Sequence, residues 1–295
     1  MDSLLTRYAP LLMGGGRIET TPNGTRLILS STSSARYGDA QLDDYAGLPR
    51  RSFPHRPPLR LSLRARFSHA GQRHSPHVTR HDLSGSAGFG FWNNPFGPQS
   101  KILALPQAIW FFYASPPSNM SLALDASGHG WKAACIDAGR PSALAWAPIA
   151  PLLMLVCRSP KLYRAIWPRA QRALGISESP PAFRQAATAN HRSPTASSRL
   201  DTPARTRASS TFSMTDWHTY ELEWRRDGAR WWVDGELVLE TDRSPRGPLG
   251  FVAWIDNQYA VVKPQGNLRF GLLDTSFEQW LEIAEVSVTR EGVMT

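Results

Sequence analysis

Three aspartates that lie beside aromatic residues are the side chains of this chain best suited to acid chemistry. Asp43 and Asp44 precede Tyr45 in the segment RYGDAQLDDY. Asp256 follows Trp254 in the segment GFVAWIDNQY. A carboxyl group in an aromatic pocket can have a raised pKa and act as a general acid. Neighbouring strand residues point to opposite faces, so at most one of Asp43 and Asp44 would enter a cleft. Turn capping and solvation by water are the alternative roles of all three.

A stretch rich in aromatic and amide side chains predicts a binding surface. The segment 88–97, GFGFWNNPFG, holds four aromatic residues and two asparagines and no charge. Strand alternation places its first two phenylalanines on one face and its first two glycines with Trp92 on the other. Glycines on the ligand side would let a ligand approach the backbone. Trp92 would then stack on a sugar ring or an apolar skeleton, with Asn93 and Asn94 at its edge.

The alternative for this segment is an edge strand whose aromatic residues pack in the core and whose Asn-Asn-Pro sequence forms a turn. Similar reasoning extends the predicted surface to other aromatic and amide residues. The predicted ligand-binding residues are Tyr45, Trp92, Asn93, Asn94, Trp110, Trp131, Trp254, Asn257 and Tyr259.

The charge balance raises the question of an anionic partner. The formal net charge is +9 and the isoelectric point is about 10.1. Such a balance is typical of proteins that bind nucleic acids or anionic membranes. The sequence has no pattern of a known nucleic-acid-binding motif, so we expect no nucleic-acid partner. The cysteines, Cys135 and Cys157, are expected to be reduced and buried.

Histidines gather between positions 55 and 81, and His74, His77 and His81 have a spacing that would align on a helix. The segment that carries them contains Pro, Ser and Gly and has the composition of a loop, so neither a metal site nor a cofactor is predicted. The N-terminal segment lacks the pattern of a signal peptide, and a cytoplasmic location is therefore expected.

The elements that position these residues are expected to be short antiparallel strands. Residues 59–67 alternate apolar and polar side chains, which is typical of a strand with one buried face. Asp234-Gly235 separates two apolar runs and predicts a hairpin. Many short strands with regular turns predict an all-β fold, an antiparallel jelly-roll β-sandwich.

The sandwich sequence is interrupted once. We expect residues 1–140 and 214–295 to form the two parts of one jelly roll, with a helical insertion at 141–176 and a flexible loop at 177–213. The insertion would pack its apolar face on the sandwich, contact an anionic membrane surface through residues 144–175, or cover a ligand cleft as a lid. The apolar face of its last helix comprises Leu162, Tyr163, Ile166, Trp167, Ala170 and Leu174.

Two segments near the C-terminus carry a family resemblance. WHTYELEW at 217–224, followed by RWWVDG at 230–235, resembles laminarinase-type (family 16) glycoside hydrolases of the concanavalin A-like lectin/glucanase superfamily. The resemblance implies two curved antiparallel sheets, with ligands lying across the concave one. Active members of that family carry an E-x-D-x-x-E motif before the W-H-x-Y strand. Before Trp217 this chain has only Glu19 and Glu178, neither with an acidic partner at that spacing. The usual two-carboxylate mechanism is therefore not expected.

Three functions are compatible with these observations. In the first, the chain binds a glycan, a glycolipid or another partly apolar small molecule on an aromatic concave sheet that a helical lid partly covers. In the second, it is an enzyme for an apolar substrate, a cyclase or isomerase of an isoprenoid- or polyketide-like molecule, with an Asp as general acid and tryptophans stabilising a cation. In the third, it is a peripheral membrane protein.

Overall fold

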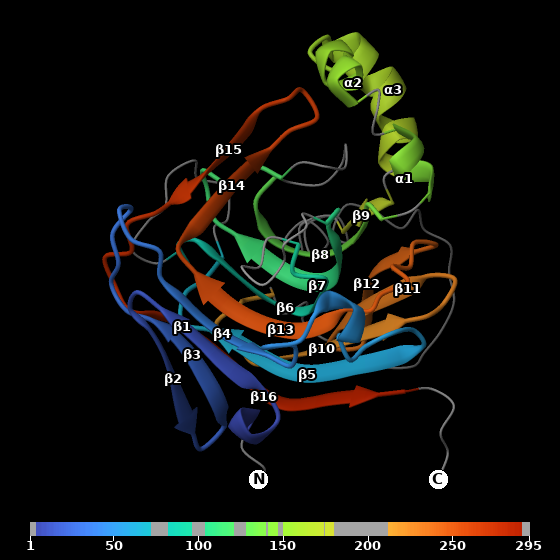
Figure 1. The fold of residues 1–295 in the computed structure, drawn as a ribbon. Coiled ribbons are helices and arrows are strands. Elements are labelled where there is room, and N and C mark those ends of the chain that lie inside the picture. Colours follow the sequence, from blue (N-terminus) through green and yellow to red (C-terminus); the bar gives the residue numbers. More distant parts are fainter. Residues whose placement is uncertain are drawn as a thin grey trace, which may run out of the picture.

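Two antiparallel seven-stranded sheets packed face to face make up the body of the protein (Figure 1). The computed structural model describes residues 4–71, 82–95, 104–120, 128–139, 141–146, 150–173, 175–179 and 212–290. In order across sheet A, the strands are β1 (Ala9–Met13), β4 (Asp39–Asp43), β13 (Gly250–Asp256), β6 (Ser86–Trp92), β7 (Gln107–Ala114), β8 (Gly130–Asp137) and β9 (Ile176–Glu178). In order across sheet B, they are β12 (Glu236–Thr241), β11 (Ala229–Val233), β10 (His218–Trp224), β5 (Leu59–Phe67), β16 (Gln279–Thr289), β3 (Gly24–Leu29) and β2 (Gly16–Thr21). The predicted all-β sandwich is confirmed.

Local sequence explains the strands of sheet B well. In β5 every second side chain is buried, and the side chains between them are exposed or half-buried. The predicted hairpin between β11 and β12 turns at Asp234 and Gly235, whose φ angles are 51° and 80°. Positive φ at both central residues is what a tight hairpin turn requires, and Asp-Gly supplies it at low cost.

An aromatic core joins the two sheets. Phe89, Phe111 and Trp131 of sheet A pack against Phe67 and Tyr220 of sheet B, with ring centroids between 5.0 and 5.5 Å apart across the interface. Burial of each such side chain contributes about 1.5–3 kcal/mol to stability. Because sheet A turns this face toward sheet B, its opposite face, called here the outer face, is free to carry a site.

The predicted helical insertion is present between β8 and β9. It contains α1 (Pro141–Trp146), α2 (Ala150–Val156) and α3 (Pro160–Ala173). The buried side of α3, at Trp167 and Ala170, packs with Cys157 and with half-buried Leu153 and Tyr163. The described buried residues of α3 thus pack within the insertion, and α3 also lies next to β9 of sheet A. Both cysteines are buried, and within the described residues neither forms a disulfide, as predicted.

The predicted flexible loop at 177–213 is wrong at its start. Residues 176–178 form β9, which pairs with β8 at the edge of sheet A. Residues 180–211 lie outside the described part of the chain, as do His74, His77 and His81.

Three smaller elements complete the fold. A separate hairpin of β14 (Gln258–Val262) and β15 (Leu268–Leu272) follows β13, and 3-10 helices span Leu4–Thr6 and Arg50–Ser52. Within the described residues, no helix is long and apolar enough to cross a membrane. The helical insertion and the β14–β15 hairpin both extend from the side of the sandwich on which sheet A presents its outer face (Figure 1).

Candidate functional site

Three tryptophans lie next to one another on the outer face of sheet A. Trp92 on β6, Trp110 on β7 and Trp254 on β13 are each half-buried. The ring centroid of Trp110 is 6.0 Å from that of Trp92 and 5.3 Å from that of Trp254. We call these three residues the tryptophan row. It forms an apolar floor of indole rings whose remaining exposed surface is available for stacking.

Two glycines of β6 make the tryptophan row sterically possible. Gly88 pairs with Trp254 in the strand register, and Gly90 pairs with Trp110. A Cβ atom at Gly88 would lie 2.7 Å from Cη2 of Trp254, and one at Gly90 would lie 2.6 Å from Cα of Trp110. The expectation that these glycines admit a ligand to the backbone is therefore wrong, because the neighbouring tryptophans take up that space.

The indole N–H groups of the row have different partners. Nε1 of Trp92 donates to the Tyr45 hydroxyl at 2.6 Å, and Nε1 of Trp254 donates to Ser86 Oγ at 3.0 Å. Nε1 of Trp110 is buried, and it has no hydrogen-bond partner among the described residues. Within the described residues, the centre of the row therefore holds a buried donor that lacks a hydrogen-bond partner.

A pair of carboxyl groups lies at one end of the outer face. Asp39 of β4 and Asp256 of β13 are direct partners in the strand register, and both are buried. Asp256 accepts hydrogen bonds from Ser86 Oγ at 2.7 Å and from the Gln258 amide at 3.1 Å. Burial nevertheless raises the pKa of Asp256 to about 6. Oδ1 of Asp39 has no hydrogen-bond partner among the described residues.

The environment favours the protonated form of this pair. Burial, and next the charge of Asp256, raise the pKa of Asp39 well above its usual range, while a hydrogen bond with Tyr37 opposes the rise. Tyr37 also hydrogen-bonds Asp256, and burial raises its own pKa. Asp39 was not among the predicted site residues. The sequence feature that could have indicated Asp39 is the alternation that places Asp39, Gln41 and Asp43 on one face of the same strand.

Asp43 also belongs to the outer face and is connected to the tryptophan row. Its carboxylate accepts hydrogen bonds from Gln41 Nε2 at 2.8 Å and from the Tyr45 amide at 3.1 Å. Gln41 also donates to the Tyr45 hydroxyl at 3.3 Å, and that hydroxyl accepts from Trp92. Burial raises the pKa of Asp43. Burial also raises the pKa of Tyr45, whose ring stacks on Phe53.

Asp44 does not share this face. Its carboxylate accepts the Phe251 amide at 2.8 Å and contacts His55 Nε2 at 2.5 Å. These contacts join β13 to the segment that precedes β5, so the catalytic role predicted for Asp44 does not fit its position. Of these two neighbouring aspartates, Asp43 is the one that lies on the outer face.

Trp131 does not fit the predicted ligand surface. It points into the core between the sheets and is 1% exposed. Trp131 and Lys132 are consecutive residues of β8, so their side chains point to opposite faces of sheet A. A ligand on the outer face would not touch it.

Of the three asparagines predicted to bind ligand, Asn93 and Asn257 use their side chains to bind loop backbone, and Asn94 lies in a turn. Asn93 donates to the Leu105 carbonyl at 2.9 Å, and its Oδ1 accepts the Gln107 amide at 3.0 Å. Asn257 is fully buried and hydrogen-bonds backbone carbonyl groups of neighbouring loops. Asn94 occupies a turn at φ 42°, where Asn is one of the few residues tolerated. Tyr259 lies on β14, half-buried in the separate hairpin.

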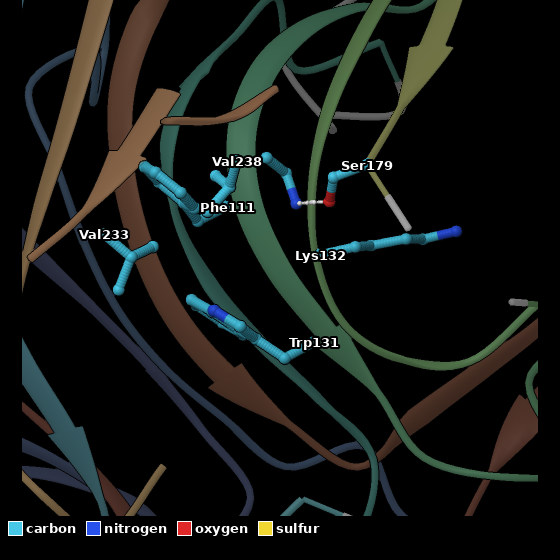
Figure 2. A pocket seen from close by; sticks show the side chains of 7 residues that line it. Phe111, Trp131, Lys132, Ser179, Val233 and Val238 are labelled. Atoms are coloured by element: carbon cyan, nitrogen blue, oxygen red, sulfur yellow. Dashed lines mark hydrogen bonds between the residues drawn. The ribbon is translucent and has the colours of Figure 1, made fainter. Parts of the chain in front are cut away.

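A buried ion pair closes the other end of the outer face. Nζ of Lys132 lies 3.0 Å from Oε1 of Glu178 and 5.1 Å from the Phe112 ring centroid, so the cation is held against an aromatic face. Burial lowers the pKa of Lys132, and Glu178 opposes that shift. Figure 2 shows Lys132 extending away from Trp131 and Val233, which line a small hollow on the inner side of β8. That hollow is apart from the tryptophan row.

Part of the chain matches a known family. The family model described as glycosyl hydrolases family 16 matches residues 186–254. That range includes the segments 217–224 and 230–235, so the resemblance to this family is confirmed for this part of the chain. Among curated proteins, none matches the chain.

Several solved structures are similar to this chain at low sequence identity. A β-glucanase of Bacillus licheniformis is 11% identical with a TM-score of 0.42, and the match covers 93% of this chain and 82% of that one. A Crh5 transglycosylase in complex with NAG is 10% identical with a TM-score of 0.44, over 99% of this chain and 82% of that one. A pseudo β-1,3-glucanase of Mycobacterium tuberculosis is 10% identical with a TM-score of 0.39, and the match covers 91% of this chain and 78% of that one.

Proposed function

We propose that this protein binds a glycan or a partly apolar glycan conjugate across the tryptophan row. The observation that carries the proposal is three adjacent half-buried indoles on one sheet face, with a central N–H that has no hydrogen-bond partner among the described residues. Sugar rings present apolar C–H faces together with hydroxyl acceptors, which suits a floor that is flat, aromatic and sparsely polar.

The polar complement comes from β4 and β13. Asp39, whose pKa burial raises well above its usual range, would donate a hydrogen bond to a ligand oxygen, while Asp43 and Gln41 would orient a ligand through Tyr45. A ligand oxygen that accepts from Trp110 Nε1 would also relieve the cost of a buried, unpartnered donor, which is about 1–3 kcal/mol.

The helical insertion and the β14–β15 hairpin would act as partial cover for a bound ligand. Both extend on the side of the outer face (Figure 1). Such cover would suit a ligand with an apolar portion, since it would remove that portion from water.

Replacing Trp110 by Phe tests the proposal. The variant keeps a stacking ring but removes the unpartnered N–H, and we expect its affinity to fall about tenfold, the effect of one lost hydrogen bond in a desolvated site. The measurement is tryptophan fluorescence titration with β-linked gluco-oligosaccharides and with an alkyl glucoside. Preference for the alkyl glucoside would identify the conjugate as the ligand class.

Trp280→Phe is the matched control, because Trp280 lies half-buried on sheet B, where it stacks with Arg26 and Arg66. Its affinity should equal that of the unmodified protein. Absence of binding to either probe, or an equal loss in both variants, would contradict the proposal.

A second candidate function is acid catalysis on an apolar substrate. The observation that favours it is the connection from Trp254 through Ser86 to Asp256, whose pKa is raised to about 6 by burial. A protonated Asp256 would transfer its proton to an epoxide oxygen of a linear isoprenoid. The neighbouring indoles would stabilise the resulting carbocation until a proton is lost to water.

Incubation with the epoxide of farnesol tests this second candidate. Formation of a cyclised isomer of unchanged mass, lost in Asp256→Asn, would establish catalysis. An unchanged epoxide, or equal conversion by the variant, would leave binding as the function.

A further inference from the structure

Two separate elements expose large apolar side chains on the side of the molecule that carries the tryptophan row. The residues are Leu152, Leu155 and Leu162 of α2 and α3, and Leu268 and Phe270 of β15, with exposed fractions from 47% to 69%. Single exposed leucines are ordinary on protein surfaces, but a set gathered on two projecting elements marks an interaction surface.

The apolar exposure of α2 follows directly from its sequence. The helix reads APLLMLV and contains no polar side chain. A helix that is apolar all round requires a partner on every side. Among the described side chains of this helix, Leu153 packs with Cys157 and with α3. Leu152 and Leu155, three positions apart on another side, remain in water.

All the charged residues in the two segments that carry these apolar side chains are basic. Residues 141–175 contain five basic residues and no Asp or Glu. Residues 258–272 add Lys263 and Arg269, again without an acidic residue. All five basic side chains of the insertion are exposed. Leucine and phenylalanine surrounded by Lys and Arg form the pattern of elements that lie in the interface of an anionic bilayer.

We propose that the α2–α3 tip and the β14–β15 hairpin together dock this protein on a membrane surface that contains anionic phospholipid. The two elements extend in the same direction from the sandwich (Figure 1), so both can meet one plane. The apolar side chains enter the boundary between headgroups and acyl chains, and the basic side chains bind the headgroup phosphates.

Docking in this way turns the outer face of sheet A toward the membrane. The inference does not depend on the proposed ligand, because it rests on side chains outside the tryptophan row. It adds a source for a ligand with an apolar portion, which would pass from the bilayer to the row without crossing water.

Co-sedimentation of the full chain with vesicles tests the inference. Vesicles of phosphatidylcholine alone are compared with vesicles containing 30% phosphatidylserine, at low and high salt. We expect binding only to the anionic vesicles and a decrease with salt. Phe270→Ser should reduce the partition coefficient about tenfold or more, as expected from losing one buried aromatic side chain. Lys161→Glu with Arg164→Glu should reduce it by at least about 25-fold, at about fivefold for each charge.

Matched controls use exposed residues outside both elements. Leu237→Ser on β12 removes an apolar side chain that is also exposed, and Arg246→Glu reverses an exposed charge in the loop before β13. Both should bind vesicles like the unmodified protein. Equal binding to the two kinds of vesicle, no binding to either, or equal losses in the controls would overturn the inference. It would also be overturned if Phe270→Ser abolished self-association in size-exclusion chromatography and left vesicle binding unchanged.

Discussion

Replacing Gly90 by Ala is expected to lower the free energy of unfolding by about 4 kcal/mol. Gly90 has φ +147°, a conformation that residues with a Cβ rarely adopt, and such strain costs about 1–3 kcal/mol. The added Cβ would also lie 2.6 Å from the backbone Cα of Trp110, and overpacking of this kind costs about 1–3 kcal/mol more. Equilibrium unfolding in urea, followed by far-ultraviolet circular dichroism, measures the change.

A second glycine separates the two contributions. Gly47 has φ +75°, but an added Cβ there would meet no atom within 4 Å. Gly47→Ala should therefore show the cost of strain alone, about 1 kcal/mol. If the two variants were destabilised equally, the contact between β6 and Trp110 would not limit this position.

Replacing Asp256 by Asn should make the protein more stable at neutral pH and leave its stability at pH 4 nearly unchanged. Burial raises the pKa of Asp256 from 3.8 to about 6, so the folded chain keeps a proton that the unfolded chain loses between these values. The free energy of unfolding therefore falls by about 3 kcal/mol as pH rises from about 4 to about 6, and the deficit persists above that range. Asn keeps an oxygen for the hydrogen bonds from Ser86 and Gln258 and cannot ionise.

The pH profile of unfolding distinguishes this effect from a general stabilisation. The difference between variant and unmodified protein should grow between pH 4 and 7. Some pH dependence should remain, because Asp39 also has a raised pKa. Asp242→Asn serves as a control, since the carboxylate of Asp242 is 78% exposed. A gain in stability at pH 4 as large as that at pH 7, or a matching gain in the control, would contradict the assignment of burial as the cause.

The sequence was sufficient where a local pattern determines the structure. The alternation of residues 59–67 predicted β5, and Asp234-Gly235 predicted the β11–β12 hairpin, because both signals act within a few residues. The alternation within the segment that starts at residue 88 placed Trp92 on the face opposite Phe89 and Phe91, which the structure confirms. The course of the chain after residue 176 was less clear. The short strand β9 depends on pairing with β8 and on the ion pair of Lys132 with Glu178, which are distant in sequence.

Which residues make up the candidate site could not be predicted from local sequence, because it depends on contacts between residues that are distant in the chain. Trp131 has the same residue type as Trp110, but whether each faces the core depends on the register of β7 against β8. Asn257 looked like a ligand residue because of its polar neighbours, yet its amide is consumed by loop carbonyl groups 16 and 221 positions away. The pairing of Asp39 with Asp256 joins strands more than 200 residues apart, which no local pattern reveals.

The helical insertion leaves and re-enters the sandwich at almost the same point. Ile136 on β8 pairs with Ile176 on β9, and the Asp137 amide donates to the Gly175 carbonyl at 3.1 Å. The intervening helices are therefore the long loop of a β8–β9 hairpin, closed at its base by the sheet. Since closing a longer loop adds only slightly to its entropic cost, segments of other lengths could be exchanged at this base while the sandwich stays the same. The helices of the insertion are thus a segment that could be replaced without a change in the two sheets.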